Sequence, residues 1–240
     1  MRSLPSFLEY LLGSMTSGPP VLPGGLDLDM LPGLLERDDP VILDVGCNDC
    51  SHTLEFLRLF KRAKVHAFEP EPRAMQSARH RVKDDRVSLY DVAISDVDGE
   101  TEFFVSNGLP SAEWQQVRPN GWDLSGSIKK PKEHLVVHPW CTFDESIVVK
   151  TMKLDTWRRM QGLERIDFLW ADVQGAEENL IRGGRETLRR TRYFYTEYSD
   201  QELYEGQIGL RKILWLLPGF KIVHRYAGDV LLVNKRWGRF

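Results

Sequence analysis

Apolar runs and amphipathic stretches alternate along the first half of the chain. VILDV (41–45), KVHAFEP (64–70) and RVSLYDVAIS (86–95) are short and apolar, which predicts strands. HTLEFLRLFKR (52–62) and RAMQSARHRV (73–82) repeat apolar residues at helical spacing. Strands that alternate with helices predict a parallel sheet with helices on both faces.

The same alternation returns in the second half. Strands are predicted at VVKTMKL (148–154), RIDFLWADV (165–173) and RYFYTEY (192–198). The helices predicted between and after them are DTWRRMQG (155–162), AEENLIRGGRETLRR (176–190) and IGLRKILWLL (208–217).

The end of the chain departs from this alternation. FKIVHRY (220–226) and DVLLVN (229–234) are separated only by Ala227 and Gly228, which is too short for a parallel crossover. These strands must therefore pair as an antiparallel hairpin. The expected fold is α/β and Rossmann-like, with a mostly parallel seven-stranded sheet and an antiparallel strand near the C-terminus.

Two regions lack the alternating pattern. DGETEFFVS (98–106) begins with Asp98-Gly99, which predicts a hairpin turn, and an irregular stretch rich in Gly, Pro, Ser and Trp follows over residues 106–140. A long irregular stretch inside a compact domain is usually functional or disordered, so we interpret it as an insertion. Residues 1–38 contain Pro-Pro and Gly-Gly pairs and are expected to form a loosely attached leader that caps one edge. Residues 39–240 are expected to form a single domain.

Composition narrows the class of protein. The chain has 240 residues, a net charge of −3 and 3 cysteines. There is no overall basic field to recruit nucleic acid, no apolar run of the ~18 residues that a membrane span needs, and no disulfide framework. We expect a cytoplasmic protein without a nucleic-acid partner or membrane span, either monomeric or a homo-oligomer.

The stretch LDVGCNDCSH (43–52) has two incompatible interpretations. Cys47 and Cys50 stand in a Cys-x-x-Cys spacing close to His52, which is typical of zinc, redox or haem sites. The third cysteine, Cys141, is distant, and no second pair completes four zinc ligands. Alternatively, the stretch is a strand that ends in an acid and a glycine turn. We favour this second interpretation, with both cysteines as small packing residues.

In a doubly wound sheet, the first strand-to-helix turn binds the ligand. Gly46 would allow a close approach of the backbone, and Asn48 tolerates the left-handed geometry of such a turn. Glu69 ends the second strand, where an acid can accept both hydroxyls of an adenosine ribose.

A ribose acid is common to nicotinamide and S-adenosylmethionine enzymes. Only the first glycine of the dinucleotide pattern Gly-x-Gly-x-x-Gly is present, and the terminal hairpin is typical of class I methyltransferases. S-adenosylmethionine is therefore the preferred cofactor. An NAD-dependent oxidoreductase and a methyltransferase-like binding module without turnover are the alternatives.

The motifs together resemble those of the FkbM-type S-adenosylmethionine-dependent methyltransferases over roughly residues 40–234. The motifs that carry the resemblance are LDVGCNDC, AFEPEP, LYDVAISDVDGE, SGSIKK, VKTMKLDTW and, above all, RIDFLWADVQGAEENLIRGG. The resemblance implies a class I methyltransferase that transfers a methyl group to a hydroxyl of a sugar or small natural product.

The resemblance also implies roles for single residues. Asp44 and Gly46 would hold the methionine end of the cofactor and Glu69 the ribose. Asp91, Val92 and Ala93 would border the adenine, and Asp172 would stand beside the reacting centre. Three residues depart from the usual family pattern. Cys50 replaces a glycine, Trp170 a common lysine and Gln174 a common glutamate.

Asp172 ends the fourth parallel strand and is the first candidate for the base that receives the proton of the acceptor hydroxyl. His134 and His138 are alternative bases. Glu177 and Glu197 could join Asp172 as ligands of Mg²⁺.

The insertion is the expected acceptor site. It carries tryptophans with flat faces suited to a sugar, Trp122 among them, and lysines suited to an anionic group, Lys129 and Lys130 among them. The alternative is that the tryptophans only pin the insertion to the core. YTEYSDQELYEGQ (195–207) is a second candidate wall.

Overall fold

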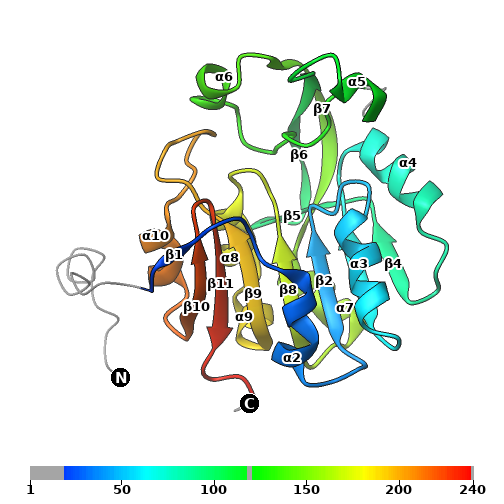
Figure 1. Ribbon diagram of the computed structural model, residues 1–240, viewed down its shortest axis with the longest axis vertical. Helices are drawn as coiled ribbons and strands as arrows, with labels where there is room; N and C mark the ends of the chain where they lie inside the picture. Colours follow the sequence, from blue (N-terminus) through cyan, green and yellow to red (C-terminus); the bar gives the residue numbers. More distant parts are fainter. Residues whose placement is uncertain (1–18, 118–120, 239–240) are drawn as a thin grey trace.

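The structure is a computed structural model that describes residues 19–117 and 121–238, and its centre is a twisted eight-stranded sheet (Figure 1). Five strands are parallel, as predicted. In spatial order, the strands are β1 (Val21–Leu22), β10 (Phe220–Tyr226), β11 (Asp229–Asn234), β9 (Thr191–Glu197), β8 (Ile166–Ala171), β2 (Val41–Val45), β3 (Lys64–Phe68) and β4 (Val87–Tyr90). The order reverses between β2 and β8, which is the switch point where ligands bind in such sheets.

The C-terminal hairpin is confirmed. β11 is antiparallel to both β10 and β9, so it is the reversed strand of an otherwise parallel arrangement. The predicted count of seven strands is wrong by one, because Val21 and Leu22 add β1 in parallel to the outer edge of β10.

Residues 19–38 are packed more firmly than a loosely attached leader would be. A 3₁₀ helix (Leu28–Met30) and α2 (Leu31–Leu35) follow β1, and Leu31 and Leu35 are fully buried against Ile42 and Phe168. The sequence pattern does not predict these leucines as core residues, because Pro and Gly interrupt their spacing. Residues 1–18 of the expected leader lie outside the described residues.

Helices cover both faces of the sheet, as predicted, because neighbouring residues of a strand point to opposite sides. Ile42 faces α2 and α3, whereas Leu43 faces α7, α8 and α10. The bounds are α3 (Ser51–Leu59), α4 (Pro72–Arg81), α7 (Leu154–Gln161), α8 (Glu177–Gly183), α9 (Arg185–Arg189) and α10 (Leu210–Leu216).

The helix predicted over 176–190 breaks at Gly183-Gly184. A Cβ on Gly183 would lie 2.0 Å from the carbonyl oxygen of Ser95, so glycine permits the close approach of a neighbouring strand. That strand is β5 (Ala93–Ser95), the second half of the strand predicted over 86–95. The prediction of one strand is wrong there, because the chain leaves the main sheet after Tyr90.

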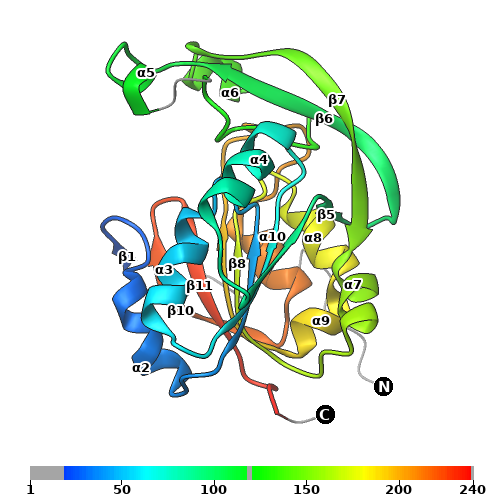
Figure 2. The ribbon, with the colours of Figure 1, turned by 90° about the vertical axis from the view of Figure 1, so that its right-hand side faces the viewer.

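β5 belongs to a second sheet, in the order β5-β7-β6. β6 (Gly99–Gly108) and β7 (Cys141–Lys153) form a long antiparallel ribbon that includes the strand predicted at 148–154. The hairpin predicted at Asp98-Gly99 is wrong, because β7 lies between β5 and β6. Figure 2 shows the ribbon rising above the main sheet with α5 (Trp114–Val117) and α6 (His134–Val137) at its upper end. Most of the predicted insertion thus lies above the carboxyl ends of the parallel strands.

Within the described residues, no helix has the length and apolar character required to cross a membrane.

Candidate active site

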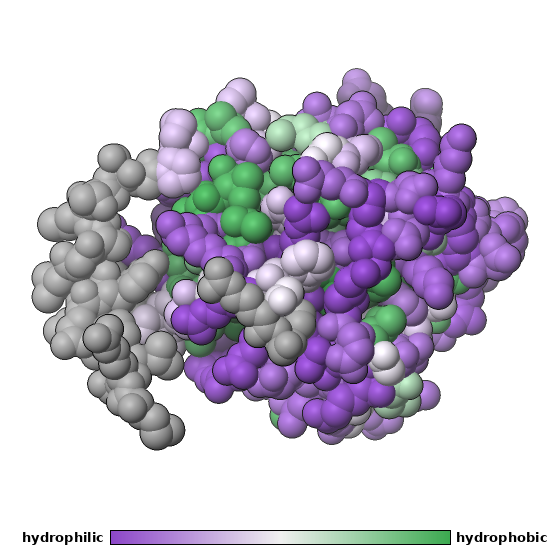
Figure 3. All heavy atoms as spheres, turned by 90° about the horizontal axis from the view of Figure 1, so that it is seen from below, coloured by the Kyte–Doolittle hydropathy of each residue, from purple (hydrophilic) through white to green (hydrophobic). Residues whose placement is uncertain are grey.

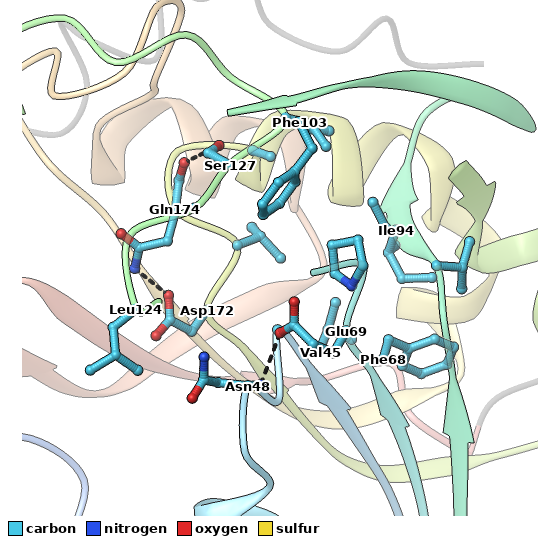
Figure 4. A pocket seen from close by; sticks show the side chains of 18 of the residues that line it. Val45, Asn48, Phe68, Glu69, Ile94, Phe103, Leu124, Ser127, Asp172 and Gln174 are labelled. Carbon is cyan, nitrogen blue, oxygen red and sulfur yellow. Dashed lines mark hydrogen bonds between the residues drawn. The ribbon is translucent and has the colours of Figure 1, made fainter. Parts of the chain in front are cut away.

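A cleft lies between the carboxyl ends of the parallel strands and the insertion (Figure 4). Its strand side consists of lining residues from 45–48, 68–70, 92–94 and 172–176. Its insertion side consists of Asp123, Leu124, Gly126, Ser127 and Ile128, together with Phe103 of β6. The empty space between these residues is about 620 Å³, which includes space open to solvent.

A second hollow lies at the opposite end of the sheet, the end that Figure 3 faces, where hydrophilic side chains predominate on the surface. It is lined by α8 to α10 and β10, with six basic side chains and one acidic side chain, Glu186. The cleft, in contrast, is lined by Glu69, Asp123 and Asp172 and by no basic residue. A cationic ligand is therefore suited to the cleft and not to the second hollow.

The turn after β2 is formed around Gly46. Gly46 has a φ of 80°, and a Cβ there would lie only 1.8 Å from the carbonyl oxygen of Asp172. Gly46, which was expected to allow a ligand to approach, therefore also allows the backbone of Asp172 at the end of β8 to lie close to the turn. The backbone N–H groups of Gly46 and Cys47 both donate to the carbonyl of Phe68, at 2.9 and 3.0 Å.

Cys47 and Cys50 are buried packing residues. Both belong to one buried cluster with Ala67, Met75 and Ala78, and their sulfur atoms are 3.5 Å apart as free thiols. Cys50 has a φ of 63°, a conformation that favours glycine, which agrees with the glycine that the family has at this position.

The nearby His52 contacts the ring of Trp170, with 4.2 Å between centroids. Trp170 itself is buried and stacks on Tyr195, so the position where the family commonly has lysine belongs here to the core.

Glu69 points into the cleft from the end of β3 (Figure 4). Its Oε2 accepts the N–H of Asn48 at 2.9 Å, and its Oε1 accepts the N–H of Glu71 at 2.8 Å. Each carboxylate oxygen has more than one lone pair, so both can accept a further donor. Burial raises the pKa of Glu69 to about 8. Asn48, with a φ of 47°, also donates through Nδ2 to the carbonyl of Asp123, 2.9 Å away.

The residues expected at the adenine divide into two groups. Val92 and Ala93 line the cleft beside Phe68. Asp91 does not line it, because its side chain is exposed and pairs with Arg79 at 2.5 Å. The sequence does not predict this difference, because neighbouring residues in the turn face opposite ways and their direction depends on the fold.

Asp44 is fully buried beneath the turn and is not among the lining residues. Its Oδ2 accepts the hydroxyl of Thr53 at 2.5 Å, whereas Oδ1 has no hydrogen-bond partner. Burial raises the pKa of Asp44 to about 7.

Asp172 lines the cleft at the end of β8. Its Oδ1 accepts the side-chain amide of Gln174 at 2.5 Å. Burial raises the pKa of Asp172 to about 6, although the bond from Gln174 lowers it and the nearby charge of Asp229 raises it.

Glu177 is buried and Glu197 is half-buried, both close to Asp172. Burial raises the pKa of Glu177 to about 7, and burial together with the charge of Asp172 raises the pKa of Glu197 well above its usual range. Across residues 19–117 and 121–238, no group of three His, Cys, Asp or Glu side chains is arranged to hold a metal ion. The geometry of these three carboxyls thus gives no support to the Mg²⁺ site considered from the sequence.

His134 and His138 lie outside the cleft lining. His134 is buried against Phe143 and Tyr204, and burial lowers its pKa to about 4. His138 lies between the rings of His134 and Trp140.

The acceptor candidates of the insertion do not line the cleft either. The ring of Trp122 packs edge-on against Trp114 and Trp140, at centroid distances of 5.4 and 4.9 Å, so these tryptophans hold the insertion together. Lys130 is exposed and Lys129 is half-buried. The insertion residues that do line the cleft were not singled out as site residues. Their only signal was the motif SGSIKK (125–130), which contains Gly126, Ser127 and Ile128.

The strand order, the reversed strand β11 and an acid-lined cleft with a buried carboxylate at the end of β3 define a class I S-adenosylmethionine-dependent methyltransferase. The acids suit a cationic cofactor, and Glu69 presents two carboxylate oxygens to the cleft. The chain belongs to the FkbM methyltransferase family, because the family model described as "Methyltransferase FkbM domain" matches residues 44–232. The alternative of an NAD-dependent oxidoreductase is therefore wrong.

Several known proteins are similar to this chain. The chain is 51% identical over 208 residues to the 2-O-methyltransferase NoeI of Sinorhizobium fredii (strain NBRC 101917 / NGR234), over 85% of this chain and 83% of the relative. Among solved structures, methyltransferase FkbM from Methylobacillus flagellatus KT is similar, with a TM-score of 0.49 and 12% identity, over 82% of this chain and 44% of the other. Precorrin-6y C5,15-methyltransferase from Geobacter metallireducens GS-15 is similar with a TM-score of 0.42 and 14% identity, over 85% and 83% of the two chains.

Proposed function

We propose that this protein methylates a hydroxyl oxygen of a sugar-type acceptor, at a carbon numbered 2, with Asp172 as the base. The 51% identity to a 2-O-methyltransferase over most of both chains supports the reaction and the position. The observation that carries the role of Asp172 is its place in the cleft, where a carboxylate borders both the strand side and the insertion side.

The strand side is proposed to hold the cofactor. Glu69 would accept the ribose hydroxyls, Val92 and Ala93 would contact the adenine, and Gly46 would present its backbone. Asp44 would hold the methionine end, and its unpartnered Oδ1 supports this role because the cofactor ammonium would supply the missing donor.

S-adenosylmethionine, when bound, supplies an already activated methyl group. The protein then has to align the acceptor oxygen and remove its proton. A carboxyl with a pKa of about 6 is mostly ionised at pH 7.5, yet basic enough to share the proton of a hydroxyl as it reacts. Asp172 meets both requirements.

The insertion over residues 106–140 is proposed to form the acceptor side. Leu124 and Ile128 offer apolar contacts to a sugar ring within the cleft, and Trp122 braces the segment that carries them. Lys129 and Lys130 would meet an anionic group at the rim, and Glu197 would act on the acceptor only through its contact with Gln174.

An Mg²⁺-dependent version would require Asp172, Glu177 and Glu197 to be ionised together. Their raised pKa values oppose this, so activity is expected to survive EDTA. Loss of activity in EDTA that Mg²⁺ restores would instead favour the metal version.

The deciding experiment is methyl transfer from labelled S-adenosylmethionine to a panel of nucleotide sugars, free glycosides and hydroxylated macrolides. Asp172→Asn keeps the shape but removes the charge, so turnover should fall by roughly 10²–10⁴, the usual contribution of a general base, with little change in S-adenosylhomocysteine affinity. Asp91→Asn is the matched control, since that acid faces Arg79 at the surface and should leave turnover intact.

Two outcomes would contradict the proposal. Full turnover by Asp172→Asn would remove Asp172 as the base and move attention to His134 and His138. Tight S-adenosylhomocysteine binding without transfer to any acceptor would favour a binding module.

A further inference from the structure

Gln174 lies in the turn after β8 and contacts both carboxyls of the proposed reaction centre. Its Nε2 donates to Oδ1 of Asp172 at 2.5 Å and to Oε2 of Glu197 at 3.3 Å. A primary amide has two N–H groups, so both bonds can exist at once. Figure 4 shows the Gln174 side chain directed at Asp172.

The other end of the amide contacts Tyr204. The Tyr204 hydroxyl is 3.0 Å from Oε1 of Gln174 and 2.8 Å from the carbonyl oxygen of Ser125, and its single proton can go to either. Tyr204 is almost fully buried. A Cβ added to Gly175 would lie only 2.7 Å from the Cβ of Tyr204. The phenol is thus packed firmly against the turn, and it limits how the amide can rotate.

The backbone of Gln174 also contacts the insertion. Its carbonyl oxygen accepts the hydroxyl of Ser127 at 2.7 Å. Gln174 therefore joins Asp172 to Ser127 of the insertion and to Tyr204 of the loop after β9. A glutamate at this position could not donate to Asp172 while ionised, and it would place a third acid beside Asp172 and Glu197.

We propose that Gln174 is a positioning residue, whose amide orients Asp172 toward the acceptor hydroxyl and keeps its carboxylate ionised, while Tyr204 fixes the orientation of the amide. The proposal rests on the role of Asp172 as base.

The electrostatics around Asp172 support this assignment. Burial raises the pKa of Asp172, and the Gln174 bond is the largest of the effects that oppose it. The other charged or titratable groups that act on this cluster come from the elements packed around it: Asp44 of β2, Lys129 of the insertion, Glu177 of α8, Glu197 of β9 and Asp229 of β11. Only one of these five can carry a positive charge, so a neutral donor at position 174 is well suited to stabilise an anion.

The first test uses Gln174→Glu, which keeps the size of the side chain. Loss of a bond to a charged group, worth about 1.5–3 kcal/mol, corresponds to roughly one to two pH units. The acidic limb of the kcat–pH profile should move up by at least about one unit, with S-adenosylhomocysteine affinity changed less than about threefold. Gln201→Glu adds the same charge at an exposed site of the loop that carries Tyr204, and it should leave the limb in place.

A second readout does not depend on the acceptor. Infrared titration follows the protonated-carboxyl band of the Asp172–Glu197 pair, which is assigned by its change in Asp172→Asn. Its midpoint should rise in Gln174→Glu and, by a smaller amount, in Tyr204→Phe, which keeps the packed ring but loses the hydroxyl. A rise in both variants, absent from Gln201→Glu, would support the proposal.

An unchanged midpoint and pH limb in folded Gln174→Glu would overturn the proposal. If that variant fails to fold, an unchanged midpoint in Tyr204→Phe would overturn it. The proposed function fails separately, through full turnover of Asp172→Asn. If Asp172→Asn is inactive and Gln174→Glu keeps a normal kcat–pH profile, only the role of Gln174 is refuted.

Discussion

The two sides of the cleft differ in how far they depend on side-chain hydrogen bonds. On the strand side, backbone groups continue the sheet: Gly46 and Cys47 donate to Phe68, Asp172 donates to Val45, and Glu69 donates to Tyr90. On the insertion side, backbone bonds such as those between Phe104 and Ser127 are supplemented by single side chains. These side-chain bonds run from Tyr204 to Ser125, from Ser127 to Gln174 and from Asn48 to Asp123.

This difference has a consequence for function. A surface fixed by backbone bonds survives most substitutions, because every residue type carries the same amide. A surface fixed by side chains changes whenever one of those side chains changes. The strand side is therefore less sensitive to single substitutions, whereas the insertion side depends more on individual residues.

The largest expected effect that separates the sides concerns Glu69. Glu69→Ala should weaken S-adenosylhomocysteine binding by about 1.5–3 kcal/mol, because both hydrogen bonds from the ribose hydroxyls are lost, while the acceptor KM stays near its normal value. Calorimetry measures this affinity, with Asp91→Ala as the control. Asp91 follows β4, the strand next to β3, but its side chain faces the surface and pairs with Arg79. An unchanged affinity would remove Glu69 from the cofactor site.

The second prediction concerns the insertion side. Trp122→Ala removes the contacts with Trp114 and Trp140 and the bond from Nε1 to Ser125. The acceptor KM should rise by roughly tenfold, with smaller changes in kcat and in S-adenosylhomocysteine affinity, because these contacts exist before the transition state. Steady-state kinetics at saturating cofactor measure it. A variant that loses cofactor affinity as much as acceptor affinity would show that the two sides are not independent.

The third prediction concerns pH and the buried acids of the strand side. Asp44, Glu69 and Glu177 have pKa values raised to about 7, 8 and 7, whereas in an unfolded chain they lose protons near pH 4. Between these limits the folded chain holds more protons, so the stabilisation present at low pH is lost as pH rises through the folded values. The unfolding free energy without cofactor should fall by roughly 3 kcal/mol from pH 6 to pH 7, about 1 kcal/mol for each of the three groups.

Urea unfolding across this range, with Glu69→Gln as the control, measures the effect. The amide does not titrate, so the variant should lose less stability as pH rises. A free energy of unfolding that increases over this interval would contradict the assignment of these acids as buried and protonated.

The smallest expected effect concerns Cys50. Its side chain packs beneath the turn and makes no contribution to the cleft lining, so Cys50→Ser should change S-adenosylhomocysteine affinity by less than about 0.5 kcal/mol. Elemental analysis should find no stoichiometric zinc in either protein. Zinc bound at one per chain and lost in the variant would overturn the interpretation of this turn.

The sequence predicted the parts of the molecule that local pattern determines. The parallel strands, the reversed β11 and the position of Glu69 follow from apolar periodicity and from loop length. Strand β5 could not be predicted, because its departure from the main sheet depends on the contact between Gly183 and Ser95, which are distant in sequence.

The candidate site was predicted unevenly for a related reason. Asp172 and Glu69 end strands, and strand ends can be located from sequence. The tryptophans and lysines of the insertion were chosen by residue type, and type does not indicate direction. Leu124 and Ile128 line the cleft instead, since the path of an irregular segment is determined by tertiary bonds such as that of Tyr204 with Ser125.

Strand β1 has a practical consequence for handling the protein. An outer strand with unpaired N–H and C=O groups is a template for association with another chain, and a short added strand blocks this. Val21 and Leu22 pair only with Arg225 and Tyr226, so a few residues protect the upper end of β10. Shortening the chain past residue 22 would uncover that edge, and the truncated protein should aggregate at concentrations where a version that begins at residue 19 stays dispersed in light scattering.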